Sequence, residues 1–202
     1  MRPHEVTVIG AGGFGREVAQ YAAQCWGEHV VRGFLDDARP DVLGGTDRVA
    51  SGSHYLVAVG DAAVRARLAA SVRARGGRLA TLVHPLAHVA PTARLGAGTI
   101  LCPFAFVGAG AAVGTNVVVN TYASVAHDAV VGRDTVFSPY ATVNGSVRVG
   151  AEVFLGTRAT VTPGHVVGDR AALSAGAVAF HDVAPDTVVA GNPAVARRAV
   201  PA

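Results

Sequence analysis

Large apolar residues recur along the back half of the chain with a period of six, separated by small and polar residues. The run begins at Val83, ends at Leu173 and contains no insertion. A period of six fits neither the 3.6-residue turn of an α-helix nor the two-residue alternation of a simple strand. It is typical of a hexapeptide β-helix, a solenoid in which each hexad forms one flat side of a coil. The sixteen apolar positions are Val83, Val89, Leu95, Leu101, Val107, Val113, Val119, Val125, Val131, Phe137, Val143, Val149, Leu155, Val161, Val167 and Leu173.

Other columns of the repeat support the same fold. The residue two before each apolar position is usually small, and the residue just after it is often Gly or Asn. Because Gly and Asn tolerate positive φ, we expect this second column to form the corners. Proline recurs in the next column, as at Pro103 and Pro139, which suits a corner without a ladder N–H. Three hexads would close a triangular coil, and the run gives a little over five coils.

The front of the chain has a different pattern, in which short apolar runs alternate with helical segments. This alternation predicts a small parallel sheet. Gly10, Gly12 and Gly15 match the G-x-G-x-x-G spacing between a strand and a helix, a turn that lets a diphosphate approach the backbone. The alternative is that the glycines only make a tight strand-to-helix turn. We expect strands at 6–9, 30–34, 55–59 and 79–82, and helices at 16–25 and up to residue 75.

These patterns predict three segments. Residues 1–82 would form an α/β half-Rossmann domain, which is too small for a full dinucleotide fold and suits a nucleotide diphosphate better than NAD. Residues 83–178 would form a left-handed parallel β-helix. Residues 179–202 leave the hexad phase and would form a tail packed on or beyond the solenoid.

Composition and charge narrow the functional classes. The chain is 50% apolar and 15% charged, with a formal net charge of +3. Residues 95–126 contain no charged residue, but Asn116, Asn120 and the unbroken hexad phase argue against a membrane span. The N-terminus has no signal-peptide pattern, and two cysteines form no disulfide framework, so we expect a cytoplasmic protein. No basic patch interleaved with aromatic residues suggests nucleic acid.

One corner carries candidate catalytic chemistry. His127 lies in the proline column and should point outward, with Asp128 beside it. A histidine near its ordinary pKa is a suitable general base, and a neighbouring carboxylate can fix its tautomer; a plain surface histidine is the alternative. Gly145 follows one coil later, so its backbone N–H should lie beside His127 as a candidate oxyanion donor. No spacing among the histidines predicts a metal cluster within one chain.

Four segments together resemble a known family. They are GAGGFGREV at 10–18, FLDD at 34–37, NTYASVAHD at 120–128 and AGNPA at 190–194. The chain resembles the sugar O-/N-acyltransferases of the sialic-acid acetyltransferase type, and within them the N-acetyltransferases of nucleotide 4-amino sugars, such as the bacillosamine and perosamine enzymes. The resemblance covers nearly the whole chain.

The resemblance implies a direct transfer from acetyl-CoA to the amino group of a nucleotide-linked amino sugar, in a homotrimer and without a metal. His127 would be the general base assisted by Asp128, the Gly145 backbone would hold the thioester carbonyl, and Asn120 would contact the sugar amine. Acetyl-CoA would lie in a groove between two solenoids. The implied nucleotide-sugar contacts are Gly10, Gly12, Gly13, Phe14, Asp36 and Asp37. The implied CoA contacts are Ser174, Gly176, Ala177, Gly191, Asn192, Pro193 and Arg197.

Three positions depart from the family pattern. Many members have His at the position of Phe14, some have a second His at the position of Val136, and the residue after G-N-P-A is usually Lys rather than Val195. Arg197 and Arg198 would then serve the CoA phosphates. These departures leave the prediction of acyl transfer in place and make the identity of the acceptor sugar less specific.

Other functions stay open from the sequence alone. Transfer to a sugar hydroxyl would use the same histidine. A zinc hydratase on the same solenoid, a non-catalytic nucleotide-sugar-binding module and an NAD-dependent front domain are more remote alternatives. The nucleotide, the sugar and the acyl length are not encoded in any motif.

Overall fold

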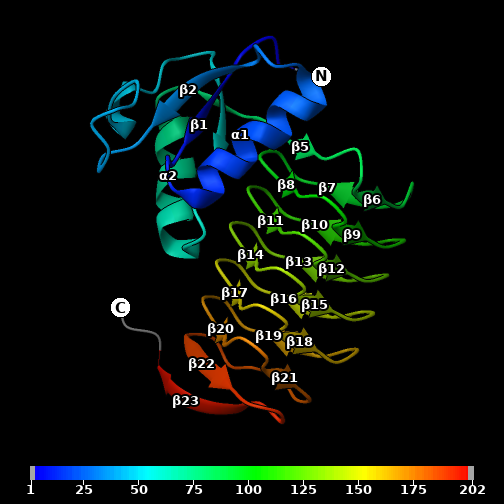
Figure 1. Ribbon diagram of the computed structural model, residues 1–202. Coiled ribbons are helices and arrows are strands. Elements are labelled where there is room, and N and C mark those ends of the chain that lie inside the picture. Colours follow the sequence, from blue (N-terminus) through cyan, green and yellow to red (C-terminus); the bar gives the residue numbers. More distant parts are fainter. Residues whose placement is uncertain (1–2, 200–202) are drawn as a thin grey trace.

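The computed structural model describes residues 3–199, with the side chains of Arg198 and Ala199 left aside. A small α/β region lies against one side of a long solenoid, next to its first coils (Figure 1). The solenoid runs from this region to a C-terminal hairpin at its far end. The predicted combination of an α/β front and a parallel β-helix is confirmed.

The α/β region contains a four-stranded parallel sheet with the order β2-β1-β3-β4. Both helices follow a strand, as the alternating pattern predicts, but α1 begins three residues earlier than expected, within the glycine turn. The predicted strand at 79–82 is instead split between the end of this sheet and the first solenoid strand. The elements are β1 (Val6–Ile9), α1 (Gly13–Trp26), β2 (Val31–Leu35), a 3₁₀ turn η1 (Thr46–Arg48), β3 (His54–Val57), α2 (Ala62–Ala74) and β4 (Arg78–Leu79).

Two-residue strands build the three flat faces of the solenoid. The first face contains β5 (Leu82–Val83), β8 (Ile100–Leu101), β11 (Val118–Val119), β14 (Val136–Phe137), β17 (Phe154–Leu155) and β20 (Ala172–Leu173), followed by β22 (Thr187–Ala190) and β23 (Val195–Ala199). The second face contains β6 (His88–Val89), β9 (Phe106–Val107), β12 (Ser124–Val125), β15 (Thr142–Val143), β18 (Thr160–Val161) and β21 (Val178–Ala179). The third face contains β7 (Arg94–Leu95), β10 (Ala112–Val113), β13 (Val130–Val131), β16 (Arg148–Val149) and β19 (Val166–Val167). We call the corner after each face the first, second and third corner.

The hexad residues fill the interior of the prism. Each strand pairs in parallel with the strand one coil later, so Val107 faces Val125 and Val125 faces Val143. From Leu101 to Leu173 every hexad residue is at most 4% exposed. Val83, in the first coil, is 38% exposed, because the end of a solenoid has no further coil to cover it. This stacked apolar column is the main source of burial in the fold.

The α/β region docks on the first face. Val18 and Ala22 of α1 belong to one buried cluster with Ile100, Val118 and Val136, which point outward from the first face. Farther along, Phe154 occupies the same column but is 37% exposed. The first face is therefore covered over its first coils and open over its last ones.

The column of glycines just after the hexad residues does not have the predicted backbone conformation. None of these glycines has a positive φ; the left-handed position lies two residues later, where most residues are not glycine, as at Asn116, Asp128 and Glu152. The glycines are needed for a different reason. A Cβ built on Gly114 would lie 2.8 Å from the backbone nitrogen of Arg133 in the next coil. Close approach of adjacent coils, rather than chirality, explains this column.

We expect Gly114→Ala to lower the free energy of unfolding by about 2 kcal/mol, because an added methyl group must push two coils apart. The measurement is urea or thermal unfolding followed by circular dichroism. Gly60→Ala is the matched control, since a Cβ at Gly60 meets nothing within 4 Å. Equal stability of both variants would contradict this explanation of the glycine column.

No helix among residues 3–199 is long and apolar enough to cross a membrane. The uncharged segment 95–126 forms strands and corners of the solenoid, with most of its apolar side chains facing inward or under the α/β region and with Phe104, Phe106 and Tyr122 exposed.

Candidate functional site

His127 and Asp128 form an exposed pair at the second corner, directly after β12. Their side chains are 67% and 66% exposed, and His127 Nδ1 lies 2.9 Å from Asp128 Oδ2. Asp128 has a φ of 59°, and this left-handed conformation belongs to the corner column. A carboxylate only accepts hydrogen bonds, so the contact places the ring proton on Nδ1. Nε2 is left with its lone pair, as a general base requires.

Gly145 lies directly against the His127 ring, as the one-coil spacing predicts. A Cβ built on Gly145 would be 2.5 Å from both Cε1 and Nε2 of His127. The Ser146 N–H donates to the His127 carbonyl at 3.0 Å, which ties the two corners together. Within the described chain, the Gly145 N–H donates to no other residue. This unpaired backbone donor therefore lies beside Nε2, with Gly145 itself buried under the His127 ring.

Asn120 lies at a different corner from His127. It follows β11 at the first corner, with β12 between the two residues. Its Oδ1 accepts a hydrogen bond from the Thr121 N–H at 2.7 Å, which closes the local turn. The structure does not bring Asn120 to His127 within one chain.

The glycine turn of the front domain divides into two functional halves. Gly10 has a φ of 100°, and a Cβ on Gly15 would clash with the Gly10 carbonyl, so the fold itself requires these two glycines. Gly12 and Gly13 are exposed, and a Cβ on either meets nothing within 4 Å. Packing does not require glycine there, and the backbone at the start of α1 is accessible to a ligand. Phe14 is half-buried and packs against the domain core.

Asp36 and Asp37 hold the loops around this turn. Asp36 accepts hydrogen bonds from the N–H groups of Ala11 at 2.7 Å and Ala38 at 2.9 Å. These bonds, the one from Ala11 first, hold the pKa of Asp36 below its usual value because they favour the charged carboxylate. Asp37 accepts from Thr46, both from its backbone nitrogen at 2.6 Å and from its hydroxyl at 2.9 Å. Asp36 therefore fixes the glycine turn, whereas Asp37 fixes the loop that returns to Thr46.

The residues assigned to CoA by resemblance lie around the last coil. The Ser174 N–H donates to Val189 of β22, and exposed Gly176 donates to Thr157. Gly191, Asn192 and Pro193 form an exposed turn between β22 and β23. The exposed Arg197 reaches back toward this turn, with Nη2 3.9 Å from a Cβ built on Gly191. The side chain of Arg198 and residues 200–202 of the expected tail lie outside the described residues.

Ala177 differs from the other assigned CoA contacts. Its side chain is fully buried in the solenoid core. Its N–H donates to Ser174, and its carbonyl accepts from Thr160. Both backbone groups are used and the methyl group is covered, so Ala177 supports the corner rather than facing a ligand.

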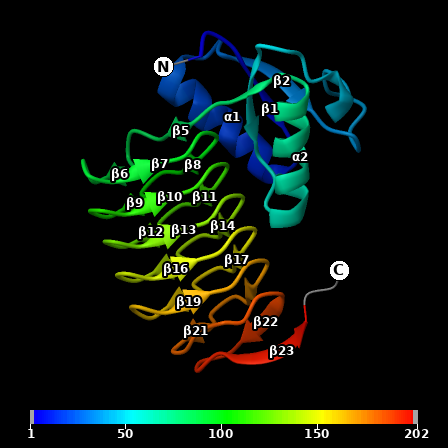
Figure 2. The same ribbon diagram turned by 180° about the vertical axis from the view of Figure 1, so that it is seen from behind.

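The two halves of the expected site lie on opposite sides of the molecule. The glycine turn belongs to the region docked on the first face, whereas the second corner, which follows β12, projects from the far side of the solenoid (Figures 1 and 2). One chain alone therefore does not place the α/β region next to His127.

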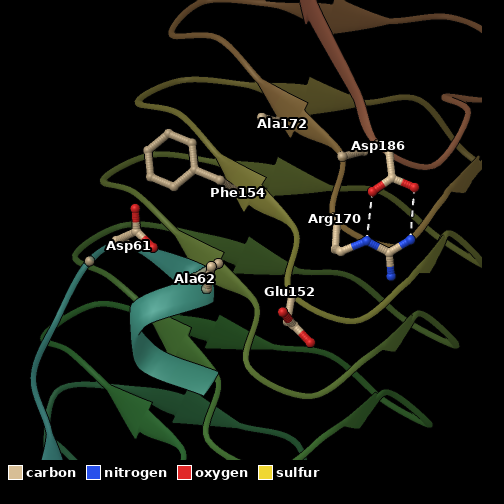
Figure 3. A pocket seen from close by; sticks show the side chains of 10 residues that line it. Asp61, Ala62, Glu152, Phe154, Arg170, Ala172 and Asp186 are labelled. Atoms are coloured by element: carbon tan, nitrogen blue, oxygen red, sulfur yellow. Dashed lines mark hydrogen bonds and ion pairs between the residues drawn. The ribbon is translucent and has the colours of Figure 1, made fainter. Parts of the chain in front are cut away.

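A pocket that the sequence patterns did not reveal lies between α2 and the open part of the first face. It has a volume of about 890 Å³, and Asp61, Phe154, Glu152, Arg170 and Asp186 contribute to its lining. Asp61 caps α2 through the Val64 N–H at 2.8 Å. Arg170 pairs with Asp186 through two contacts of 2.6 and 2.7 Å, at the edge of the pocket in Figure 3. The only sequence signal for this pocket is that a helix of 13 residues is too short to cover every coil of the first face.

Among the described side chains, no group of three His, Cys, Asp or Glu residues converges on a position for a metal ion.

Comparison with known proteins identifies the class. Residues 5–72 match the family model described as the PglD N-terminal domain. The acetyltransferase domain of PglB from Neisseria gonorrhoeae FA1090, solved with acetyl coenzyme A, is 33% identical with a TM-score of 0.88, covering 96% of this chain and 99% of that chain. No protein of curated function matches this chain in sequence.

Two further solved structures share the whole fold. A variant of perosamine N-acetyltransferase from Caulobacter crescentus, in complex with CoA and GDP-perosamine, is 29% identical with a TM-score of 0.89, covering 96% of this chain and 97% of that chain. WeeI from Acinetobacter baumannii AYE is 26% identical with a TM-score of 0.87, covering 96% and 99%. The fold and these relatives together define an enzyme of the acetyltransferase class. Within that class, the chain belongs to the sugar N-acetyltransferase family.

Proposed function

We propose that this protein transfers an acetyl group from acetyl-CoA to the amino group of a nucleotide-linked amino sugar, with His127 as general base. The observation that supports this most directly is the exposed His127–Asp128 pair above the free N–H of Gly145. Relatives that span the whole chain were solved with acetyl coenzyme A, or with CoA and GDP-perosamine. An open corner with a base and an oxyanion donor is what direct acyl transfer requires.

The proposed reaction needs no acyl-enzyme. The sugar amine attacks the thioester carbonyl while His127 Nε2 removes its proton, and the carbonyl oxygen becomes an oxyanion that the Gly145 N–H stabilises. The C–S bond then breaks, the amide C–N bond remains, and His127 returns the proton to the leaving thiolate to give CoA. Asp128 keeps the ring oriented and stabilises the imidazolium formed in between.

We infer that the site is completed between copies of the chain. The glycine turn and the second corner of one chain are on opposite sides of the solenoid. The glycine turn of one protomer must therefore lie next to the second corner of a neighbouring protomer. Such a head-to-tail contact closes into a ring when the rotation is one third of a turn, giving a homotrimer with three equal sites. Static light scattering should give three times the 20.4 kDa chain mass; a stable monomer with full activity would contradict this arrangement.

The proposed binding groups follow from accessibility. The open backbone at Gly12 and Gly13 would receive the diphosphate at the start of α1. The exposed turn Gly191–Asn192–Pro193 and Arg197 would hold CoA where it leaves the groove. Arg197 has no described carboxylate partner and so suits a phosphate group.

The test is release of free thiol from acetyl-CoA in the presence of nucleotide sugars, with the sugar product identified by mass spectrometry. A panel of UDP-, dTDP- and GDP-linked 4-amino sugars, including GDP-perosamine, should contain a substrate. GDP-rhamnose, which carries a hydroxyl in place of the perosamine amine, is the matched control. Acetylation of GDP-rhamnose in preference to GDP-perosamine would favour O-acetylation, and no thiol release with any acceptor would overturn the proposal.

A further inference from the structure

A fully buried arginine joins the front domain to the solenoid. Arg65 lies in α2 and has no exposed surface. Its Nε donates to the carbonyl of Asn116 at 2.6 Å, across the junction between the two regions. Its Nη1 donates to the carbonyls of Val57 and Val59 within the front domain. One planar guanidinium therefore binds both sides of the junction, which a single ammonium group cannot do in the same geometry.

The solenoid side of this junction is also built from buried polar groups. Asn116 Nδ2 donates to the Arg65 carbonyl at 3.3 Å and to Asp134 Oδ1 at 2.7 Å. Asp134, one coil later, is fully buried and accepts from Arg133 at 2.7 Å. Burial lowers the pKa of Arg65 to about 9 and the charge of Asp134 opposes that shift, so the guanidinium stays charged at neutral pH.

Stability alone does not explain this cluster. Burying two charged groups costs desolvation free energy that their interactions often do not recover, and the carboxylate of Asp134 pairs with Arg133 rather than with Arg65. Arg65 Nη2 and Asn116 Oδ1 also have no hydrogen-bond partner among the described residues. The cluster therefore adds little to the stability of the junction. It is well suited to fix the angle between the front domain and the solenoid, because its hydrogen bonds are directional and the guanidinium is planar and rigid.

The atoms that Arg65 holds are next to the proposed nucleotide-sugar site. Val57 ends β3, and the carbonyls of Val57 and Val59 directly precede the Gly60–Asp61 segment at the carboxyl edge of the sheet. The intervening Ala58 donates to Ile9, and its carbonyl lies 2.8 Å from a Cβ built on Gly10. Ligands of parallel sheets bind at this edge, so a rotation of β3 against the solenoid would move the whole glycine turn.

We propose that Arg65 is a positioning residue, whose contacts with Val57, Val59 and Asn116 set the direction in which the front domain presents the nucleotide-sugar to the acyl-transfer corner. This inference rests on the proposed function. The solenoid forms both the His127 corner and the surfaces between protomers, so an angle fixed between α2 and the solenoid also fixes the acceptor relative to the His127 of a neighbouring protomer.

Two variants separate positioning from stability. Arg65→Lys keeps the positive charge and removes the planar guanidinium with its several N–H donors. The double variant Arg65→Met/Asp134→Asn removes both buried charges but also the donor to three backbone carbonyls, so its thermal unfolding is measured beside its kinetics. Arg67→Met is the matched control, because Arg67 is an exposed arginine on the same helix.

Both variants should raise KM for GDP-perosamine, or for the best acceptor of the substrate panel, about ten-fold, since the acceptor would contact the front domain and the acyl-transfer corner at once and a changed angle weakens one set of contacts. KM for acetyl-CoA should change less than about two-fold, because Asp134 lies at the third corner and not at the second corner that holds His127, and Arg67→Met should change neither value. Equal changes in both KM values, or an acceptor KM within two-fold of wild type, would overturn the inference.

A second measurement does not depend on turnover. Amide hydrogen exchange of residues 57–61 should become faster in both variants, while exchange of the solenoid core around Val143 stays unchanged. If no acceptor in the panel reacts with the wild type, the proposed function fails, and this exchange measurement still tests the Arg65 contact. Unchanged exchange at 57–61 in both variants would show that Arg65 does not hold this edge.

Discussion

His127→Ala is expected to lower kcat about a thousand-fold, because a positioned general base contributes roughly 10²–10⁴ to the rate. Removing the ring leaves the amine to lose its proton to water, while the surfaces that bind CoA and the nucleotide-sugar stay in place. Its dissociation constants for CoA and for the acceptor should therefore remain within a few-fold of the wild-type values. Steady-state thiol release and isothermal titration with CoA measure the two quantities separately.

His181→Ala is the matched control for this loss. His181 lies in the same corner column three coils later, is exposed, and also precedes an aspartate, Asp182. It has no glycine one coil later and lies two coils beyond Gly145, outside hydrogen-bond reach, so its removal should leave kcat unchanged. A His127→Ala enzyme with wild-type kcat, or one that no longer binds CoA, would contradict the assigned role.

The fold of the solenoid can be predicted from the sequence because the contacts between its coils are local and periodic. Each hexad residue meets the residue one coil away, so a one-dimensional pattern contains the three-dimensional register. The error in the glycine column has a physical cause. The sequence shows that a small residue is needed after each apolar one, but close approach of coils and a left-handed φ both select glycine, and only the structure shows that the first reason applies.

Part of the candidate site could also be predicted from the sequence, namely the part that depends on the coil period. The His127–Gly145 contact follows from the eighteen-residue coil alone. The Arg65 junction and the pocket at Phe154 depend on how the front domain sits on the first face, and no periodicity encodes that docking. A helix of alanine and arginine indicates a solvated surface, yet Arg65 is the most deeply buried charge on α2. Ala177 was assigned to a ligand from its motif, while its core position follows from the hexad phase.

Gly145→Ala is expected to lower kcat about a hundred-fold, because the new methyl group displaces the His127 ring and a general base contributes roughly 10²–10⁴ to the rate only when it is positioned. The new Cβ would lie 2.5 Å from Cε1 and Nε2 of His127, so the ring must leave its present position. Gly145 has no positive φ, so the substitution adds no backbone strain and unfolding should change little. The measurement is kcat with saturating acetyl-CoA and acceptor, alongside thermal unfolding. Ser146→Ala, at the exposed neighbouring position, is the control and should retain wild-type kcat.

A double-mutant cycle decides whether Gly145 acts through His127. If the added methyl group harms the enzyme by displacing the imidazole, it should cost little more in a chain that already has alanine at position 127, and the two effects should fall far short of additivity. If the added methyl group instead keeps the thioester oxygen away from the N–H of residue 145, most of the loss should persist in the His127→Ala background. The two roles are thus distinguished by one further kcat value. A Gly145→Ala enzyme as active as the wild type would show that the ring and this backbone do not meet during catalysis.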